Sequence, residues 1–286
     1  MVFRRLKIGF GMARRSGRVL RDHPRLLVFP LVGGLSGIAF LATLFGGIFI
    51  TGPALRETGA ALYGALFAAY LVETFIASFF SAGLIAATRT ALEGGEPSVR
   101  GGLRTAWEHK GPLLAWSVIA AVVGVVIQMI ESQDNFVARI LASIFAIAWG
   151  VMTYFVVPVI VFRDPSVREM FEESARTFKD TWGESIGAMG AINVVTFLLA
   201  LVGVAVAVGV FFLLPAAGSG RLIMTVVVGG SAVLFGVLVG KTLTGISKTA
   251  LYIYATEDTA PKYFGDIDFA SMGGDEKTTG RFGGRL

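Results

Sequence analysis

One acidic residue lies alone inside a long uncharged stretch of the chain. Glu73 has 15 uncharged residues on each side, from Thr58 to Thr88. An ionisable group in an apolar segment is costly and marks a functional site by default, and its desolvation favours the protonated form. Three interpretations are open: a protonated carboxyl hydrogen-bonded to a neighbouring helix, an ion pair with Lys241, or a proton or cation site on a transport path.

Three further polar residues interrupt apolar stretches and complete a candidate intramembrane polar site with Glu73. Lys241 follows Arg221 by 20 residues, and its long side chain can bring the ammonium group to the headgroup level. Gln128 and Asn193 each lie within an apolar stretch. We expect these two side chains to form interhelical hydrogen bonds, worth about 1 kcal/mol each.

The residue types that most intramembrane catalysis requires are missing from the apolar stretches. The chain has no cysteine, which excludes thiolate catalysis and Cys-ligated metals. Its two histidines, His23 and His109, each follow a carboxylate; a metal site is one interpretation, and helix capping is favoured. No predicted span holds the histidine of a Ser–His dyad or the aspartate of an intramembrane protease. The sequence therefore predicts a non-enzymatic protein with no catalytic residue, metal or cofactor.

Basic residues are concentrated before the first apolar stretch. Each arginine or lysine near an anionic membrane surface contributes about 1 kcal/mol of attraction. We therefore predict anionic membrane lipids as partners, together with a cytoplasmic or membrane protein; a homo-oligomer is also compatible. Nucleic acid is excluded, because stacking aromatics do not accompany the basic residues. The candidate lipid-headgroup contacts are Arg4, Arg5, Lys7, Arg14, Arg15 and Arg18.

The composition requires a membrane around these side chains. The chain is 54% hydrophobic and only 16% charged, whereas soluble domains carry about 25% charged residues. A span needs about 20 apolar residues. Six stretches meet that length, and they are approximately Leu26–Ile50, Ala60–Leu84, Leu113–Ile130, Ala138–Val161, Ile186–Leu214 and Leu222–Gly240.

The distribution of basic residues predicts the orientation of these spans. Sixteen arginines and lysines lie before the first span and after the second and fourth, against three on the other side. Basic residues favour the cytoplasmic side, so both termini are expected there. The first apolar run has 30 residues between Arg25 and Arg56, longer than the 7–15 or so of a signal peptide, and we interpret it as an uncleaved signal-anchor.

A repeated pentapeptide indicates internal duplication. Glu96-Pro97-Ser98-Val99-Arg100 recurs as Asp164-Pro165-Ser166-Val167-Arg168, and each copy leads into an amphipathic stretch and two spans. The N-terminal 25 residues resemble a degenerate first copy. The predicted fold is all-α: six transmembrane helices in three hairpin repeats, at about 1–96, 97–164 and 165–260, each preceded by an amphipathic helix on the cytoplasmic side. Residues 1–260 form the membrane domain and 261–286 a flexible cytoplasmic tail.

Each amphipathic stretch has a predicted apolar face, which can lie against the headgroup region of the membrane or pack under the bundle. Pro97 and Pro165 are expected in the first turns of the second and third stretches. Apolar residues at intervals of three and four define the faces. They are Phe3, Leu6, Phe10, Ala13, Gly17 and Leu20 in the first stretch, Val99, Leu103 and Trp107 in the second, and Val167, Phe171, Ala175, Phe178 and Trp182 in the third.

Small residues and prolines predict how the spans meet. Gly33-x3-Gly37 and Gly236-x3-Gly240 are spaced so that helix backbones can approach closely. Pro30, Pro158 and Pro215 predict bends or span ends.

Four segments carry a resemblance to a known family. They are Arg21-Asp22-His23-Pro24-Arg25-Leu26-Leu27-Val28-Phe29-Pro30, Ser78-Phe79-Phe80-Ser81-Ala82, Tyr154-Phe155-Val156-Val157-Pro158 and Thr181-Trp182-Gly183-Glu184. These segments resemble a prokaryotic family of uncharacterised six-span membrane proteins. More distantly, the plan resembles the membrane domain of glycerophosphodiester phosphodiesterases, although their catalytic barrel has no counterpart here. The resemblance implies this topology and a location in the plasma membrane. It implies no activity.

Two function hypotheses follow. In the first, the protein organises lipid or a partner protein at the cytoplasmic face through its amphipathic helices. In the second, it is a small transporter or channel whose path includes Glu73. Transport predicts a polar cavity that reaches Glu73, whereas organisation predicts a dry bundle in which Glu73 bonds to a neighbouring helix.

Overall fold

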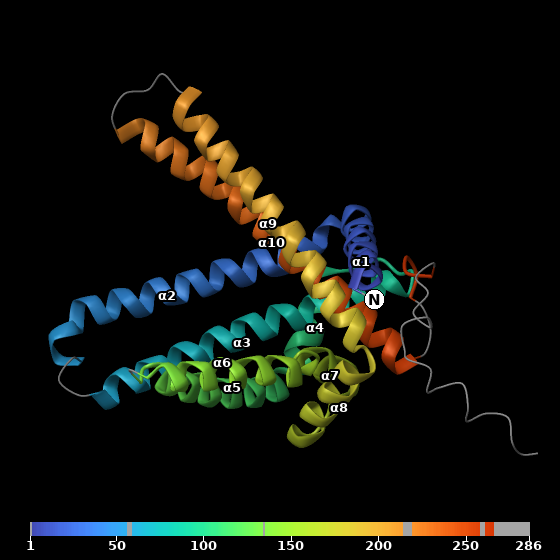
Figure 1. The fold of residues 1–286 in the computed structure, drawn as a ribbon, viewed down its shortest axis with the longest axis horizontal. Coiled ribbons are helices and arrows are strands. Elements are labelled where there is room, and N and C mark those ends of the chain that lie inside the picture. The colour runs from blue at the N-terminus through green and yellow to red at the C-terminus, as the bar shows by residue number, and fades with distance from the viewer. Residues whose placement is uncertain (1, 56–58, 134, 214–218, 258–260, 266–286) are drawn as a thin grey trace, which may run out of the picture. The chain divides into compact units, whose positions relative to one another are not determined.

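The computed structural model describes residues 2–55, 59–133, 135–213, 219–257 and 261–265, and the regular elements among them are all helical (Figure 1). Six helical segments are long and apolar enough to span a membrane, as the sequence predicts. The helices are α1 (Val2–Asp22), η1 (Pro24–Leu27), α2 (Val28–Leu55), α3 (Gly59–Leu92), α4 (Val99–Glu108), α5 (Lys110–Glu131), α6 (Phe136–Met152), α7 (Val156–Arg163), α8 (Val167–Asp180), α9 (Trp182–Leu213) and α10 (Ser219–Glu257).

The chain forms two compact units, and neither is a continuous segment. The first unit comprises Met1–Leu27, Ala91–Gly95 and Lys179–Leu286. The second unit comprises Val28–Thr90 and Glu96–Phe178. The predicted repeat units are continuous segments instead, so the threefold duplication stays a prediction.

Helices α9 and α10 form the core of the first unit and lie side by side (Figure 1). A Cβ on Gly236 would lie 3.0 Å from the Cβ of Leu199, and one on Gly240 would clash with Thr196. The absence of side chains at these two positions therefore brings the helices together. The predicted packing role of this glycine pair is confirmed.

Helix α1 packs against α9 and α10 within the first unit. A Cβ on Gly9 would clash with the carbonyl of Gly187, and the hydroxyls of Ser16 and Ser247 are hydrogen-bonded at 2.7 Å. Phe10, on the predicted apolar face, is 46% exposed, whereas Ser16 is buried. The buried side of α1 therefore combines small residues with larger ones such as Met12.

In the second unit, α2 packs on α3 through the other predicted glycine pair. A Cβ on Gly33 would lie 3.0 Å from the Cβ of Phe80, and one on Gly37 would lie 2.8 Å from Oε2 of Glu73. Helix α3 is joined to α5 by a buried hydrogen bond of 3.0 Å from the Trp116 indole N–H to the Ser78 hydroxyl. The glycine pair therefore has the predicted packing role.

Helix α4 begins later than the position of its proline predicts. Ser98 is the N-cap and accepts a hydrogen bond from the backbone N–H of Gly101, so Pro97 precedes the helix. Trp107, on the predicted apolar face, is 60% exposed. A Cβ on Gly102 would instead lie 2.5 Å from the Gly83 carbonyl oxygen. The glycine side of α4 faces α3 because only that side permits so close an approach.

The fourth span is interrupted between α6 and α7, at residues 153–155. Pro158 has no backbone N–H, and its ring would clash with the carbonyl of Tyr154 in a continuous helix. The backbone N–H of Phe155, at the interruption, donates to the hydroxyl of Ser174 in α8 at 3.0 Å. Pro158 thus produces the predicted bend, and α8 supplies a hydrogen-bond acceptor.

Helix α8 also begins at its valine rather than at its proline. Pro165 precedes the helix, and Val167, on the predicted apolar face, is 45% exposed. Phe178 is buried as predicted, together with Met170 and Ser174. Ser174 is a polar residue on the buried side of α8, because its hydroxyl bonds to the interrupted span. Hydrophobic periodicity cannot identify such a residue. The side chain of Trp182 and the whole of Pro215 are outside the part of the chain that the structure describes.

Part of the predicted tail is ordered against α1 in the first unit. Phe264 is fully buried, and Arg15 donates to the backbone carbonyl of Tyr263 at 3.2 Å. The rest of the predicted tail, 266–286, lies outside the described residues. Residues Tyr263 and Phe264 therefore belong to the packing of the first unit.

Candidate functional site

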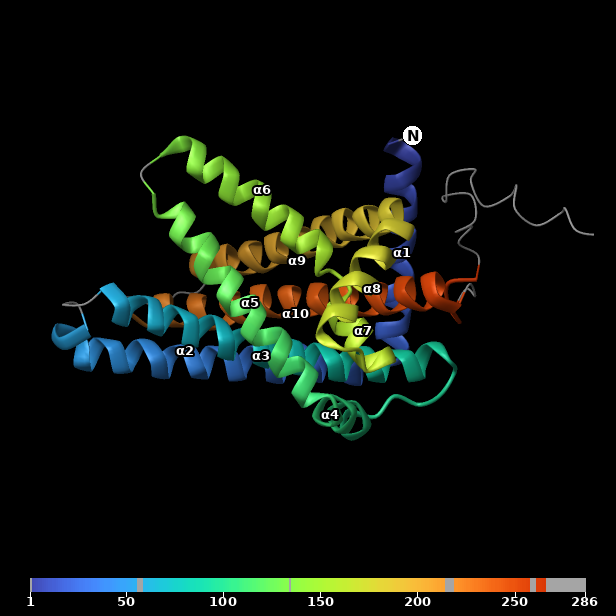
Figure 2. The ribbon, with the colours of Figure 1, turned by 90° about the horizontal axis from the view of Figure 1, so that it is seen from below.

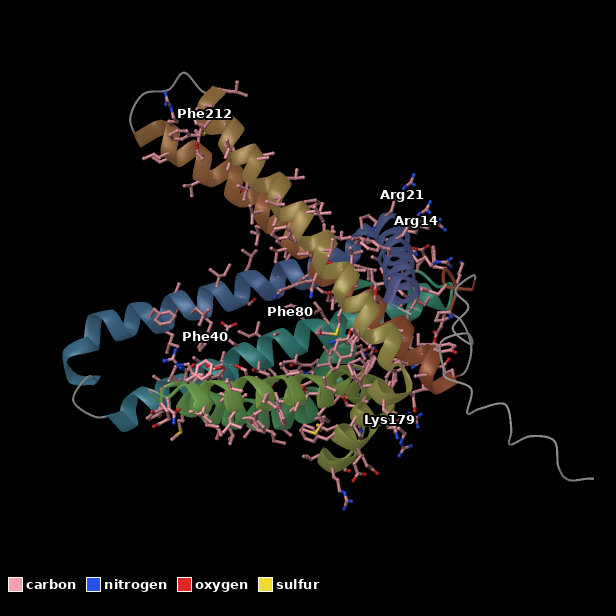
Figure 3. All side chains as sticks on the ribbon, in the orientation of Figure 1. Arg14, Arg21, Phe40, Phe80, Lys179 and Phe212 are labelled. Carbon is pink, nitrogen blue, oxygen red and sulfur yellow. The ribbon has the colours of Figure 1, made fainter. Side chains whose placement is uncertain are left out.

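Helix α1 has an exposed arginine face opposite its buried face. Arg14, Arg18 and Arg21 are exposed, whereas Met12 and Val19 have no exposed surface. The arginines are four and three residues apart, a spacing that places them along one side of a helix. Figure 3 shows Arg14 and Arg21 directed outward from α1. We define Arg14, Arg18 and Arg21 as the arginine face.

The arginine face differs electrostatically from the arginines of α4 and α8. Within the described residues, none of its three guanidinium groups has a carboxylate partner. By contrast, Arg104 pairs with Glu108 at 3.0 Å and Arg168 pairs with Glu172 at 2.6 Å. The hydrogen bond to Glu172 raises the pKa of Arg168 further above its ordinary value. Among the described residues, the arginine face therefore carries more uncompensated positive charge than these paired arginines of α4 and α8.

Two residues of this face are among the predicted headgroup contacts, which stay a prediction. Arg14 and Arg18 were predicted as headgroup contacts, and both are exposed. Arg15 instead donates to the Tyr263 carbonyl, a contact that helps to hold the chain against α1. Arg21 was not among the predicted contacts, although its spacing of three from Arg18 indicates the same face. The side chains of Arg4, Arg5 and Lys7 lie outside the described residues.

The carboxylate of Glu73 lies between α2 and α3. Its Oε2 approaches the position of the missing side chain of Gly37, and its Oε1 is buried with no hydrogen-bond partner among the residues described. Gly37 therefore provides the space for this carboxylate. Neither a bond to a neighbouring helix nor a polar cavity is found at Glu73 in the described part of the chain.

Lys241 and Asn193 lie in the first unit, whereas Glu73 lies in the second. Lys241 is exposed on α10 and Asn193 is exposed on α9. An exposed lysine near the end of a span is free to extend toward the headgroups. The ion pair between Glu73 and Lys241 stays a prediction. The Asn193 side chain makes no interhelical hydrogen bond in the described segments.

Gln128 lines an open cleft instead of bonding to another helix. The cleft has a volume of about 410 Å³ and lies between the ends of α5 and α6, which run antiparallel from their shared loop (Figure 2). Glu131, Arg139 and Ser143 complete its lining. Sequence reasoning identified Gln128 alone, because the other three residues come together only when the hairpin forms.

The two histidines are not part of a described metal site. His109 is the C-cap of α4, and its Nδ1 lies 2.8 Å from the carbonyl oxygen of Thr105. This is the predicted helix-capping role. Across the described ranges, no three His, Cys, Asp or Glu side chains form a group that could hold a metal ion.

Comparison with known proteins places the chain in a family without assigning an activity. No curated protein and no solved structure matches the chain. A family of unknown function, DUF6159, matches residues 60–262, which is more than half of the 286 residues and covers α3 to α10. The chain therefore belongs to the DUF6159 family of unknown function.

Proposed function

We propose that the protein is a non-enzymatic integral membrane protein that organises anionic lipid at the cytoplasmic face of a prokaryotic plasma membrane. Its site of lipid contact is the arginine face of α1. Both termini lie in the cytoplasm, in keeping with the excess of basic residues in the segments before the first span and after the second and fourth.

The observation that carries this proposal is the contrast between the two sides of α1. One side is fixed against α9 and α10 by the Gly9–Gly187 approach and the Ser16–Ser247 hydrogen bond. The other presents three exposed arginines without carboxylate partners in the described residues. A fixed helix loses little conformational entropy when it binds, so the arginines are prepositioned for phosphate.

The expected strength of lipid binding follows from the number of charges on the arginine face. At about 1 kcal/mol for each arginine near an anionic surface, the face contributes about 3 kcal/mol, or roughly a hundredfold in affinity. The attraction weakens at high salt, because exposed charges are screened.

The test is lipid occupancy measured by native mass spectrometry of protein from nanodiscs of mixed phosphatidylcholine and phosphatidylglycerol. We expect the triple variant Arg14→Gln, Arg18→Gln, Arg21→Gln to lose most of the preference for phosphatidylglycerol. The matched control Arg104→Gln, Arg168→Gln, Arg176→Gln removes the same charge from arginines that already have carboxylate partners. Equal losses in the two triple variants would contradict the proposal. A retained protein subunit in place of lipid would indicate a protein partner instead.

A second candidate function is transport with Glu73 on the path. The observation in its favour is the buried Oε1 of Glu73, which lacks a hydrogen-bond partner in the described residues. Such a carboxyl can exchange a proton or bind a cation. Proton flux in proteoliposomes that is lost in Glu73→Gln and kept in Asn193→Ala would favour this function, whereas the absence of flux in the wild type would exclude proton transport.

A further inference from the structure

The cleft at the loop end of the α5–α6 hairpin combines four polar side chains of mixed charge. Gln128 and Glu131 are three residues apart on α5, and Arg139 and Ser143 are four residues apart on α6. Each pair therefore occupies one side of its helix. The two sides line the cleft, which has a volume of about 410 Å³. This volume is within the range of small-molecule sites.

We propose that this cleft binds the headgroup of a zwitterionic phospholipid that carries a primary ammonium group, as in phosphatidylethanolamine. The site is separate from the arginine face of α1 and does not depend on the function proposed for it.

The position of the cleft along the spans is that of a headgroup. The third apolar span ends at Glu131 and the fourth begins at Phe136, so these residues mark the boundary between the hydrocarbon and the aqueous phase. Gln128 and Arg139 each lie three residues, or about 5 Å, deeper, and Ser143 lies seven residues, or about 10 Å, deeper. A polar cleft of this depth admits a headgroup but does not cross the membrane.

The surfaces beside the cleft are suited to acyl chains. Met129 on α5 is 45% exposed, and Phe136 on α6 is 75% exposed. Further along the same helices, Val126, Ile140 and Ile144 are also exposed. A free polar solute would gain nothing from these residues, whereas a phospholipid bound in the cleft would lay its chains along them.

The charges in the cleft match those of a zwitterion. Arg139 offers a planar guanidinium with five N–H donors, which can bind a phosphate and keep other contacts. It lies in the first turn of α6, where the helix dipole also favours an anion. Glu131 offers a carboxylate to an ammonium group. A purely anionic headgroup would satisfy Arg139 and be repelled by Glu131.

Gln128 and Ser143 add groups that suit either end of the ligand. The Gln128 amide can donate to phosphate or accept from ammonium. The Ser143 hydroxyl donates to the Arg139 carbonyl at 2.9 Å, and its oxygen can still accept. A primary ammonium has three N–H donors for these acceptors, whereas the quaternary ammonium of phosphatidylcholine has none. The cleft should therefore prefer phosphatidylethanolamine to phosphatidylcholine.

The test is competition among phosphatidylethanolamine, phosphatidylcholine and phosphatidylglycerol at equal fractions in nanodiscs, with bound lipid identified by native mass spectrometry. We expect Glu131→Gln to reduce phosphatidylethanolamine occupancy about tenfold relative to phosphatidylglycerol, the effect of one lost charge-assisted hydrogen bond. Arg139→Gln should reduce all three lipids, because each carries the phosphate. The controls Glu172→Gln and Arg168→Gln make the same changes at an exposed ion pair on α8 and should change nothing.

One further variant and one further competitor test the proposal. Ser143→Leu fills the cleft without removing a charge and should abolish the preference for phosphatidylethanolamine in folded protein. Free phosphoethanolamine, the headgroup without chains, should compete only weakly. Unchanged lipid preference in Glu131→Gln and Ser143→Leu would overturn the proposal, and so would free phosphoethanolamine that competes as well as the lipid.

Discussion

At the scale of single residues, most polar side chains in the spans have nearby partners. The Trp116 indole donates to Ser78, and the hydroxyls of Ser16 and Ser247 bond to each other. Glu73 differs, because its Oε1 is a buried carboxylate oxygen with no partner among the described residues; the buried hydroxyls of Thr88 and Thr225 also lack one. The sequence identified Glu73 as exceptional from its uncharged neighbours alone. It did not indicate Gly37 as the residue that makes space for the carboxylate, since that depends on how α2 and α3 align.

The Trp116–Ser78 hydrogen bond should contribute measurably to stability. We expect Trp116→Phe, which keeps an aromatic ring, to lower the free energy of unfolding in detergent through the lost hydrogen bond by about 0.6 kcal/mol, the measured average for such bonds in membranes, where the largest measured value is about 1.7 kcal/mol. Ser78→Ala should have a similar effect. The double variant should lose less than the sum, because each single change already breaks the bond. Strictly additive effects would show that the bond contributes nothing.

The N-terminus of α8 should weaken in acid. The Ser166 hydroxyl and backbone N–H donate to Oε2 of Glu169 at 2.6 and 2.9 Å, and these bonds lower the pKa of the carboxyl. A lowered folded-state pKa stabilises the folded form at pH values above the ordinary glutamate pKa of about 4.3, and the contribution is lost as the pH falls through the folded-state value.

Hydrogen-exchange protection factors for the first turn of α8 measure this effect. They should fall with decreasing pH in the wild type and stay low and nearly pH-independent in Glu169→Gln. The prediction fails if the two proteins show the same pH dependence.

At the scale of helices, hydrophobic periodicity predicted which segments are helical but not which faces pack inside the protein. Val99, Leu103 and Trp107 correctly indicated a helix at α4, yet its buried face contains Gly102 and Ala106. Apolar content measures transfer from water, whereas helix–helix contact in a membrane depends on how closely two backbones can approach. Small residues therefore decide the face, and a large residue such as Trp107 is left exposed.

Two adjacent glycines of α4 provide a direct test of close approach. Gly102→Ala places a Cβ against the Gly83 carbonyl oxygen, and we expect it to destabilise the protein by about 1–3 kcal/mol, the usual cost of overpacking. Gly101→Ala meets only the side chain of Ser98, at 3.5 Å or more. It should stabilise by about 0.5–1 kcal/mol, because alanine is the better helix former. Thermal unfolding of both variants in one detergent distinguishes them, and equal effects would contradict the observed α3–α4 contact.

At the scale of the whole molecule, the number of spans was predictable and their grouping was not. Hydropathy is a local property, so the six apolar segments could be identified before any contact was known. The two units combine distant segments, such as Met1–Leu27 with Lys179–Leu286, and no local pattern specifies such partners. The sequence did not predict the cleft for the same reason, since Glu131 and Arg139 come to line one cleft only in the folded hairpin.

The central claim, a basic face of the protein on the cytoplasmic side, depends on the orientation of the spans. The natural chain has no cysteine, so single cysteines can be labelled without background. Gly101 on α4 and Ser132 after α5 are both exposed and flank the third span. In intact cells, a membrane-impermeant maleimide should label Ser132→Cys at once and Gly101→Cys only after permeabilisation. The reverse pattern would place the basic segments outside the cell and contradict the account.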